Sequence, residues 1–82
     1  MKYKVGDKVV IKSIEAIDAT PEDQYGNGVT TMHFYMREFC GKVCTISSVD
    51  DTDFRIKEDL WGYYFGFWMI APPIKLMLEL VE

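Results

Sequence analysis

The chain has 82 residues, of which 49% are hydrophobic and 15% aromatic, and it carries a net charge of −4. This length allows one domain over residues 1–82 and excludes large enzyme scaffolds such as the (β/α)8 barrel. The high apolar content and low charge per residue argue against a disordered chain.

No stretch of the sequence approaches the ~18 apolar residues that a membrane-spanning helix needs. The N-terminal lysines are not followed by an apolar run, so a secretory signal is not indicated. We therefore expect a soluble, cytoplasmic protein without a membrane partner. Cys40 and Cys44 would lie ~13 Å apart on an extended segment, too far for a disulfide, and free buried thiols are expected.

The first half of the chain predicts a strand, a loop and a short helix. Residues 8–14 are rich in β-branched side chains and predict a strand. Residues 16–30 are polar and predict a long loop or open hairpin, with Asn27-Gly28 as its strongest turn signal. Over residues 31–39, apolar side chains recur at helical spacing, which favours a short helix over a strand; they are Met32, Tyr35, Met36 and Phe39.

A β-hairpin is predicted next. Residues 42–49 and 54–57 read as its strands and residues 50–53 as its turn. In the second strand Phe54 and Ile56 are expected to face inward, with the basic residues between and after them facing outward.

The last third predicts further strands. A turn over residues 58–62 precedes an aromatic strand over 63–67, and Pro72-Pro73 breaks the chain. Alternation over residues 74–82 favours an additional C-terminal strand over a helix opened by the prolines. The expected fold is mainly β, a small closed barrel of five to six strands with one short helical turn, because closure removes exposed strand edges.

Three blocks of sequence carry a family resemblance: VGDKVVI at residues 5–11, CGKVCTI at 40–46, and Phe65 followed by Met69, Ile70 and Pro72. In this order they resemble small uncharacterised SH3-like β-barrel proteins of Gram-positive bacteria and their phages. The resemblance implies an SH3-like barrel that binds peptides, proteins or nucleic acids and is rarely catalytic. The chain departs from the pattern in the segment after Ile74 and in the large aromatic residues Phe67 and Trp68.

The aromatic run over residues 61–68 is the main functional signal. On a strand, Tyr63, Phe65 and Phe67 would share one face, and Tyr64 and Trp68 the other. Either one set fills the core while the other covers the barrel ends, or the second set forms an exposed binding surface. The second interpretation predicts a non-catalytic module, monomeric or homodimeric, that binds a protein or peptide through Tyr25, Trp61, Tyr64, Phe67 and Trp68.

Two charge-based alternatives remain open. The acidic surface at Asp50, Asp51 and Asp53 is compatible with an inhibitor that imitates nucleic acid and occupies a host enzyme. Lysines at even positions near the N-terminus are compatible with weak nucleic-acid binding, although the acidic balance makes that partner less favourable; they are Lys2, Lys4, Lys8 and Lys12.

No catalytic, cofactor or metal motif is present in the sequence. His33, Cys40 and Cys44 match no zinc-site spacing. The aspartates of residues 50–53 lack the glycine and the terminal glutamate of a calcium loop. We therefore predict a protein that is not an enzyme and that uses no cofactor or metal.

Overall fold

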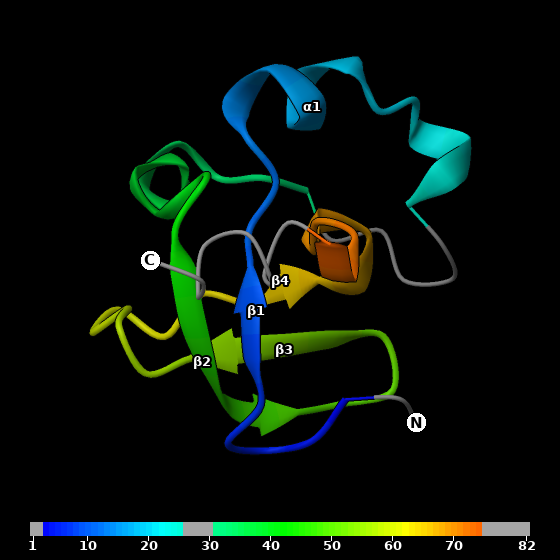
Figure 1. Ribbon diagram of the computed structural model, residues 1–82. Helices are drawn as coiled ribbons and strands as arrows, with labels where there is room; N and C mark the ends of the chain where they lie inside the picture. The colour runs from blue at the N-terminus through cyan, green and yellow to red at the C-terminus, as the bar shows by residue number, and fades with distance from the viewer. Residues whose placement is uncertain (1–2, 26–30, 75–82) are drawn as a thin grey trace.

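The computed structural model describes residues 3–25 and 31–74, and within them the fold is mainly β. Four antiparallel strands form one sheet in the order β1-β2-β3-β4, which curls into a half-barrel (Figure 1). Their bounds are Lys8–Val10 (β1), Val43–Val49 (β2), Asp53–Ile56 (β3) and Phe65–Gly66 (β4). The expected class is confirmed, whereas the described residues contain four strands in place of the expected five to six.

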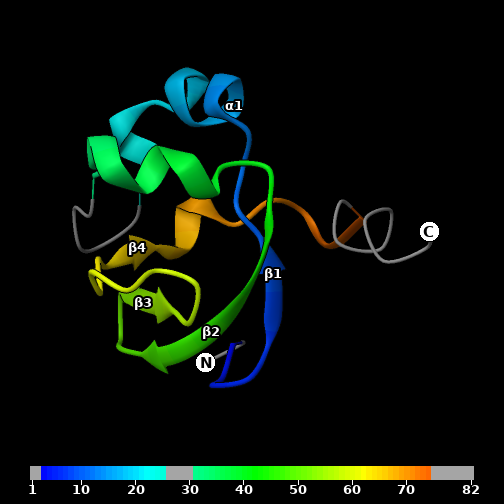
Figure 2. The ribbon, with the colours of Figure 1, turned by 90° about the vertical axis from the view of Figure 1, so that its left-hand side faces the viewer.

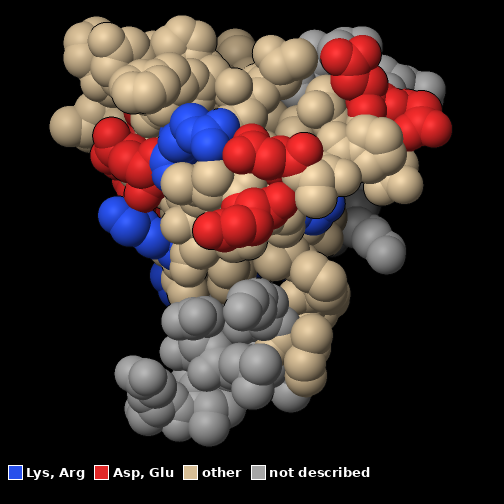
Figure 3. Space-filling view, turned by 90° about the horizontal axis from the view of Figure 1, so that it is seen from above, with Lys and Arg blue, Asp and Glu red and all other residues tan. Residues whose placement is uncertain are grey.

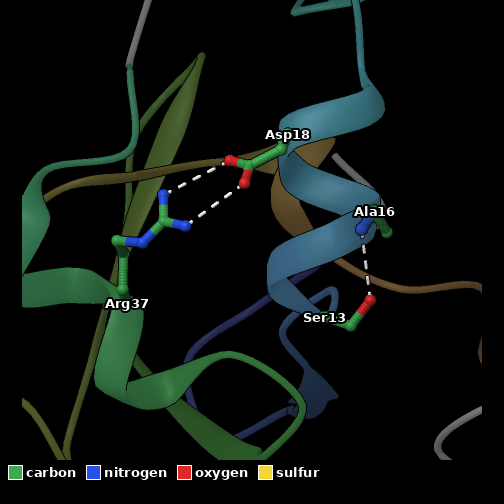
Figure 4. Close-up of polar contacts among 4 residues, drawn as sticks. All are labelled: Ser13, Ala16, Asp18 and Arg37. Atoms are coloured by element: carbon green, nitrogen blue, oxygen red, sulfur yellow. Dashed lines mark hydrogen bonds and ion pairs between the residues drawn. The ribbon is translucent and has the colours of Figure 1, made fainter.

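The first expected strand is shorter than predicted. β1 ends at Val10, with an isolated bridge at Ile11, and helix α1 (Ile14–Ala19) follows where a strand end and a loop were expected. Ser13 caps this helix: its Oγ accepts a hydrogen bond from the Ala16 N–H at 3.2 Å (Figure 4). A serine in this position provides an acceptor for a backbone N–H of the first helical turn. In a strand, that N–H would need an acceptor on a neighbouring strand.

Two 3-10 helices continue this part of the chain, η1 (Glu22–Gln24) and η2 (Phe34–Phe39). The predicted short helix is thus confirmed, but as a 3-10 helix. Because this helix has about three residues per turn, Met36 and Phe39 share its buried face and Tyr35 points to solvent. The expectation that Tyr35 belongs to the apolar face is wrong for this reason.

The helical segments α1, η1 and η2 lie together over one end of the curled sheet (Figures 1 and 2). An ion pair joins two of them: the guanidinium of Arg37 on η2 donates to both carboxylate oxygens of Asp18 on α1, at 3.3 Å each (Figure 4). This hydrogen bonding raises the pKa of Arg37.

The predicted hairpin is confirmed. β2 pairs with β3, and Phe54 and Ile56 are buried while Arg55 and Lys57 are exposed. The pairing shifts by one residue between Ile46 and Ser48, which indicates a β-bulge. The core is aromatic at this point, because the Phe54 ring stacks on Phe65 at 5.6 Å.

The expected strand over residues 63–67 is mostly wrong. β4 contains only Phe65 and Gly66, and Phe67 begins a third 3-10 helix, η3 (Phe67–Met69). The chain then returns to the outer edge of β1, where Ile70 pairs with Ile11 and the Ala71 N–H donates to the Val10 carbonyl at 2.8 Å. This return requires the turn at η3, so a continuous strand is not compatible with it.

The predicted turn at Asn27-Gly28 and the predicted C-terminal strand, from residue 75 onward, lie outside the described residues. In the part of the chain that the structure describes, no helix is long and apolar enough to span a bilayer.

Candidate functional site

Trp68, expected on the surface, is a core residue. Its side chain is 9% exposed and belongs to the main hydrophobic cluster. Tyr25 stacks on its ring with centroids 3.9 Å apart, and the Lys12 ammonium lies 5.8 Å from the ring centroid. The turn at η3 breaks the strand alternation that would have directed Trp68 outward. The surface expectation for Trp68 is therefore wrong.

Phe67 and Tyr25 are also held inside the fold. Phe67 is partly buried and stacks on Phe54 at 5.5 Å and on Tyr3 at 5.7 Å. Tyr25 is partly buried against Trp68. Of the expected binding residues, only Trp61, at 83%, and Tyr64, at 46%, are well exposed.

A buried carboxylate shapes the turn that displays Trp61. Asp59 is 6% exposed, and its two oxygens accept hydrogen bonds from the backbone N–H groups of Trp61 and Tyr63, each at 2.9 Å. Gly62, with φ of +74°, supplies the left-handed residue of the turn. As a result Leu60 and Trp61 project into solvent, with 96% and 83% of their surface exposed.

The turn after β3 meets η2 through ring stacking. The ring of Tyr63 lies 4.8 Å from His33, whose ring lies 5.4 Å from Tyr35. Phe34 packs edge-on against Tyr35 at 5.5 Å, and both are exposed. In Figure 2 η2 and the yellow segment after β3 lie on the side that faces the viewer. We call this set the aromatic surface: His33, Phe34, Tyr35, Leu60, Trp61 and Tyr63.

Sequence reasoning missed Leu60 and the η2 residues of this surface. The helical spacing places Tyr35 on the apolar face, and the 3-10 geometry turns it outward; Phe34 is not part of that expected face and is exposed as well. Asp59 is a sequence signal for the turn that carries Leu60 and Trp61, because an aspartate commonly accepts hydrogen bonds from backbone N–H groups shortly after it in the chain.

Most of the described acidic residues fall into two separate groups. Asp50 and Asp51 are exposed and Asp53 is half-buried at the β2–β3 turn. The second group lies on the helical end of the molecule, seen from above in Figure 3, and consists of Glu15, Asp18, Glu22, Asp23 and Glu38. Figures 1 and 2 place the β2–β3 turn far from α1, so the two groups do not merge into one acidic surface.

The described N-terminal lysines do not form one stripe. Lys4 precedes the turn at Gly6, and the Lys8 ammonium donates to the Thr45 hydroxyl at 3.1 Å. Lys12 lies past the end of β1 and covers Trp68. Lys2 is outside the described residues.

Neither cysteine is an activated nucleophile. Burial raises the pKa of the Cys44 thiol to about 12, and burial also raises the pKa of Cys40 although Arg37 acts in the opposite direction. Both thiols are free. Within the described ranges, no group of three His, Cys, Asp or Glu side chains is placed to hold a metal ion.

We expect Cys44 to resist alkylation in the folded protein. Its folded pKa of about 12 lies above the ordinary thiol value of 9.0, so the native state keeps the proton while the unfolded chain loses it as the pH rises through that value. This group therefore has no effect on stability well below pH 9 and disfavours the folded state between about pH 9 and 12.

Iodoacetamide labelling followed by peptide mass spectrometry at pH 8 measures this reactivity. Cys44 is expected to label in urea and not in buffer, with the partly exposed Cys40 as the internal comparison. Equal labelling of Cys44 in both conditions would contradict its burial.

A cavity of about 140 Å³ lies between β1 and the segment that follows η3, lined by Tyr3, Lys8, Val9, Val10, Ile70, Ala71 and Pro73. Ligand pockets usually measure about 300–1,000 Å³. This cavity is therefore too small for such a ligand.

Comparison of this chain with protein-family models, curated proteins and solved structures gave no match.

Proposed function

We propose that this protein is a non-catalytic binding module that contacts a protein or peptide partner through the aromatic surface. The observation that carries the proposal is the near-complete exposure of Leu60 and Trp61. A tryptophan that becomes fully buried in an interface contributes about 4–6 kcal/mol before the costs of association are subtracted. Tryptophan is also among the residues most enriched at the energetic centres of interfaces.

The turn that carries these side chains supports the same proposal. Asp59 fixes the backbone of Trp61 and Tyr63, so little conformational entropy is lost when a partner orders this segment. The stacked rings of Tyr63 and His33 extend the apolar area onto η2. A partner that covers both segments would contact a preformed surface.

We further propose that the half-barrel is an SH3-like barrel. The 3-10 helix η3 followed by the bridge between Ile70 and Ile11 supports this assignment, because it brings the end of the barrel back to its first strand. The three sequence blocks that resemble SH3-like proteins fall on the turn and strand β1, on the entry into β2, and on β4 with η3.

Replacing Trp61 by alanine is expected to abolish partner capture without changing stability. The protein is immobilised, and proteins retained from a bacterial lysate are compared between the wild type and the W61A variant by quantitative mass spectrometry. A partner lost with W61A is then purified, and its affinity is expected to fall about 30-fold or more, as for an interface residue that contributes at least 2 kcal/mol.

The matched control is Val5→Ala, which trims an exposed apolar side chain outside the aromatic surface. Capture that is equal for the wild type and W61A, or lost equally with V5A, would contradict the proposed surface. The thermal unfolding curves of all three proteins are expected to coincide within about 0.5 kcal/mol, because both side chains are solvent-exposed.

A further inference from the structure

The outward side of the sheet carries a second set of functional groups, distinct from the aromatic surface. Strand alternation places Arg55 and Lys57 outward, since Phe54 and Ile56 are buried. In the antiparallel pairing of β3 with β4, Phe54 lies opposite Phe65. One residue further along β3, Arg55 therefore lies opposite Tyr64. We call this set the outer sheet face: Lys8, Thr45, Ser48, Arg55, Lys57 and Tyr64.

Arg55 is held in position but lacks an anionic partner in the described structure. Its Nε donates to the Ser48 hydroxyl at 2.8 Å, and the guanidinium carbon lies 5.3 Å from the Tyr64 ring centroid. Among the described residues, Arg37 and Asp18 form an ion pair, and no described carboxylate forms one with Arg55. Its two terminal nitrogens therefore form an oriented fork directed at no acceptor within the described chain.

The charges around Arg55 favour an anionic group. Lys57 follows it on the same face, and the ammonium of Lys8 is held across the sheet by Thr45. The nearby carboxylate of Glu58 is engaged, because its oxygens accept from the Thr45 N–H at 2.9 and 3.2 Å. Asp53 also lies on the outward side of β3 and has an interaction of its own.

We propose that the outer sheet face binds an acidic peptide segment, with one carboxylate on the terminal nitrogens of Arg55 and an adjacent apolar side chain against Tyr64. A planar guanidinium that is already oriented binds a carboxylate through two parallel hydrogen bonds and loses little entropy in doing so. A single carboxylate matches this face better than a nucleic acid does, because the chain carries a net charge of −4 and nucleic-acid affinity depends on neutralising many phosphates.

This inference is independent of the proposed function. Tyr63 stacks on η2 and Tyr64 on Arg55, so consecutive residues direct the two surfaces to opposite sides of the same segment. Trp61 belongs to the aromatic surface, and the W61A variant is expected to bind an acidic peptide as the wild type does.

The test is an NMR titration of the 15N-labelled full chain with the capped peptide Glu-Leu-Glu-Leu-Glu. We expect shifts confined to the residues of the outer sheet face and their chain neighbours, together with the Arg55 Nε–H signal. Arg55→Gln is expected to weaken binding about tenfold or more, and Arg55→Lys nearly as much, since lysine keeps the charge but loses the fork. Lys42→Gln removes the same charge at an exposed residue outside this face and is expected to leave binding unchanged.

The proposal is overturned if the neutral peptide Gln-Leu-Gln-Leu-Gln binds equally well, or if R55Q binds as the wild type does. It is also overturned if a short oligothymidylate binds more tightly than the acidic peptide and loses affinity with R55Q, because the face would then be a nucleic-acid site. None of these outcomes involves Trp61, so each leaves the proposed function standing.

Discussion

Replacing Trp68 by alanine is expected to destabilise the fold by about 3–5 kcal/mol, the usual cost of removing a buried large aromatic side chain. The side chain is 9% exposed, and its loss leaves the Tyr25 ring without the face on which it stacks. It also removes the ring over which the Lys12 ammonium lies. A domain of this size is usually stable by about 5–15 kcal/mol, so the variant would lose a large part of its stability. Urea denaturation followed by circular dichroism measures the difference.

Trp61→Ala is the matched control, because it removes the same side chain from an exposed position. Its expected effect on the free energy of unfolding is within about 0.5 kcal/mol. If the two variants unfold at the same urea concentration, the assignment of Trp68 to the core and Trp61 to the surface is wrong.

The hairpin could be predicted because its information is local. Residues 42–49 and 54–57 alternate clearly, and Phe54 and Ile56 are among the most buried residues of the core. The short helix before the hairpin could be predicted for the same reason, since Met36 and Phe39 recur at an interval that both helix types bury on one face.

The elements that sequence reasoning missed depend on single capping groups or on distant contacts. The hydroxyl of Ser13 caps the helix over residues 14–19, and Ile17 of this helix is buried in the core. The turn at η3 depends on the bridge that Ile70 forms with Ile11. These two residues are 59 positions apart in the chain. No pattern within residues 63–70 contains that contact, so strand alternation continued through Trp68 predicts the wrong side for its ring.

The candidate site was predicted only in part for a related reason. The exposure of Trp61 and Tyr64 followed from the excess of aromatic residues in one short segment. The contribution of η2 to the surface requires the stacking of His33 on Tyr63, which joins two segments separated by the whole hairpin. The orientation of Arg55 likewise depends on Ser48 of β2 and on Tyr64 in the segment before β4.

Replacing Asp59 by alanine is expected to cost about 2–4 kcal/mol, because two backbone N–H groups lose their acceptors at a buried site. The same change is expected to weaken partner capture through the aromatic surface, since the backbone of Trp61 is no longer held. Amide hydrogen exchange measures the local effect directly, and the protection of the Trp61 and Tyr63 amides should fall more than that of β2. Asp59→Asn keeps one acceptor oxygen, and its stability and amide protection are expected to lie between those of the wild type and of D59A.

Asp51→Ala is the control for this prediction, because it removes an exposed carboxylate from another turn. It is expected to leave stability, exchange and capture unchanged. Should D59A lose partner capture while the Trp61 and Tyr63 amides remain protected, Asp59 would have to contact the partner itself. Its 6% exposure argues against that, since a carboxylate with both oxygens occupied by backbone donors acts through the shape of the turn that it stabilises.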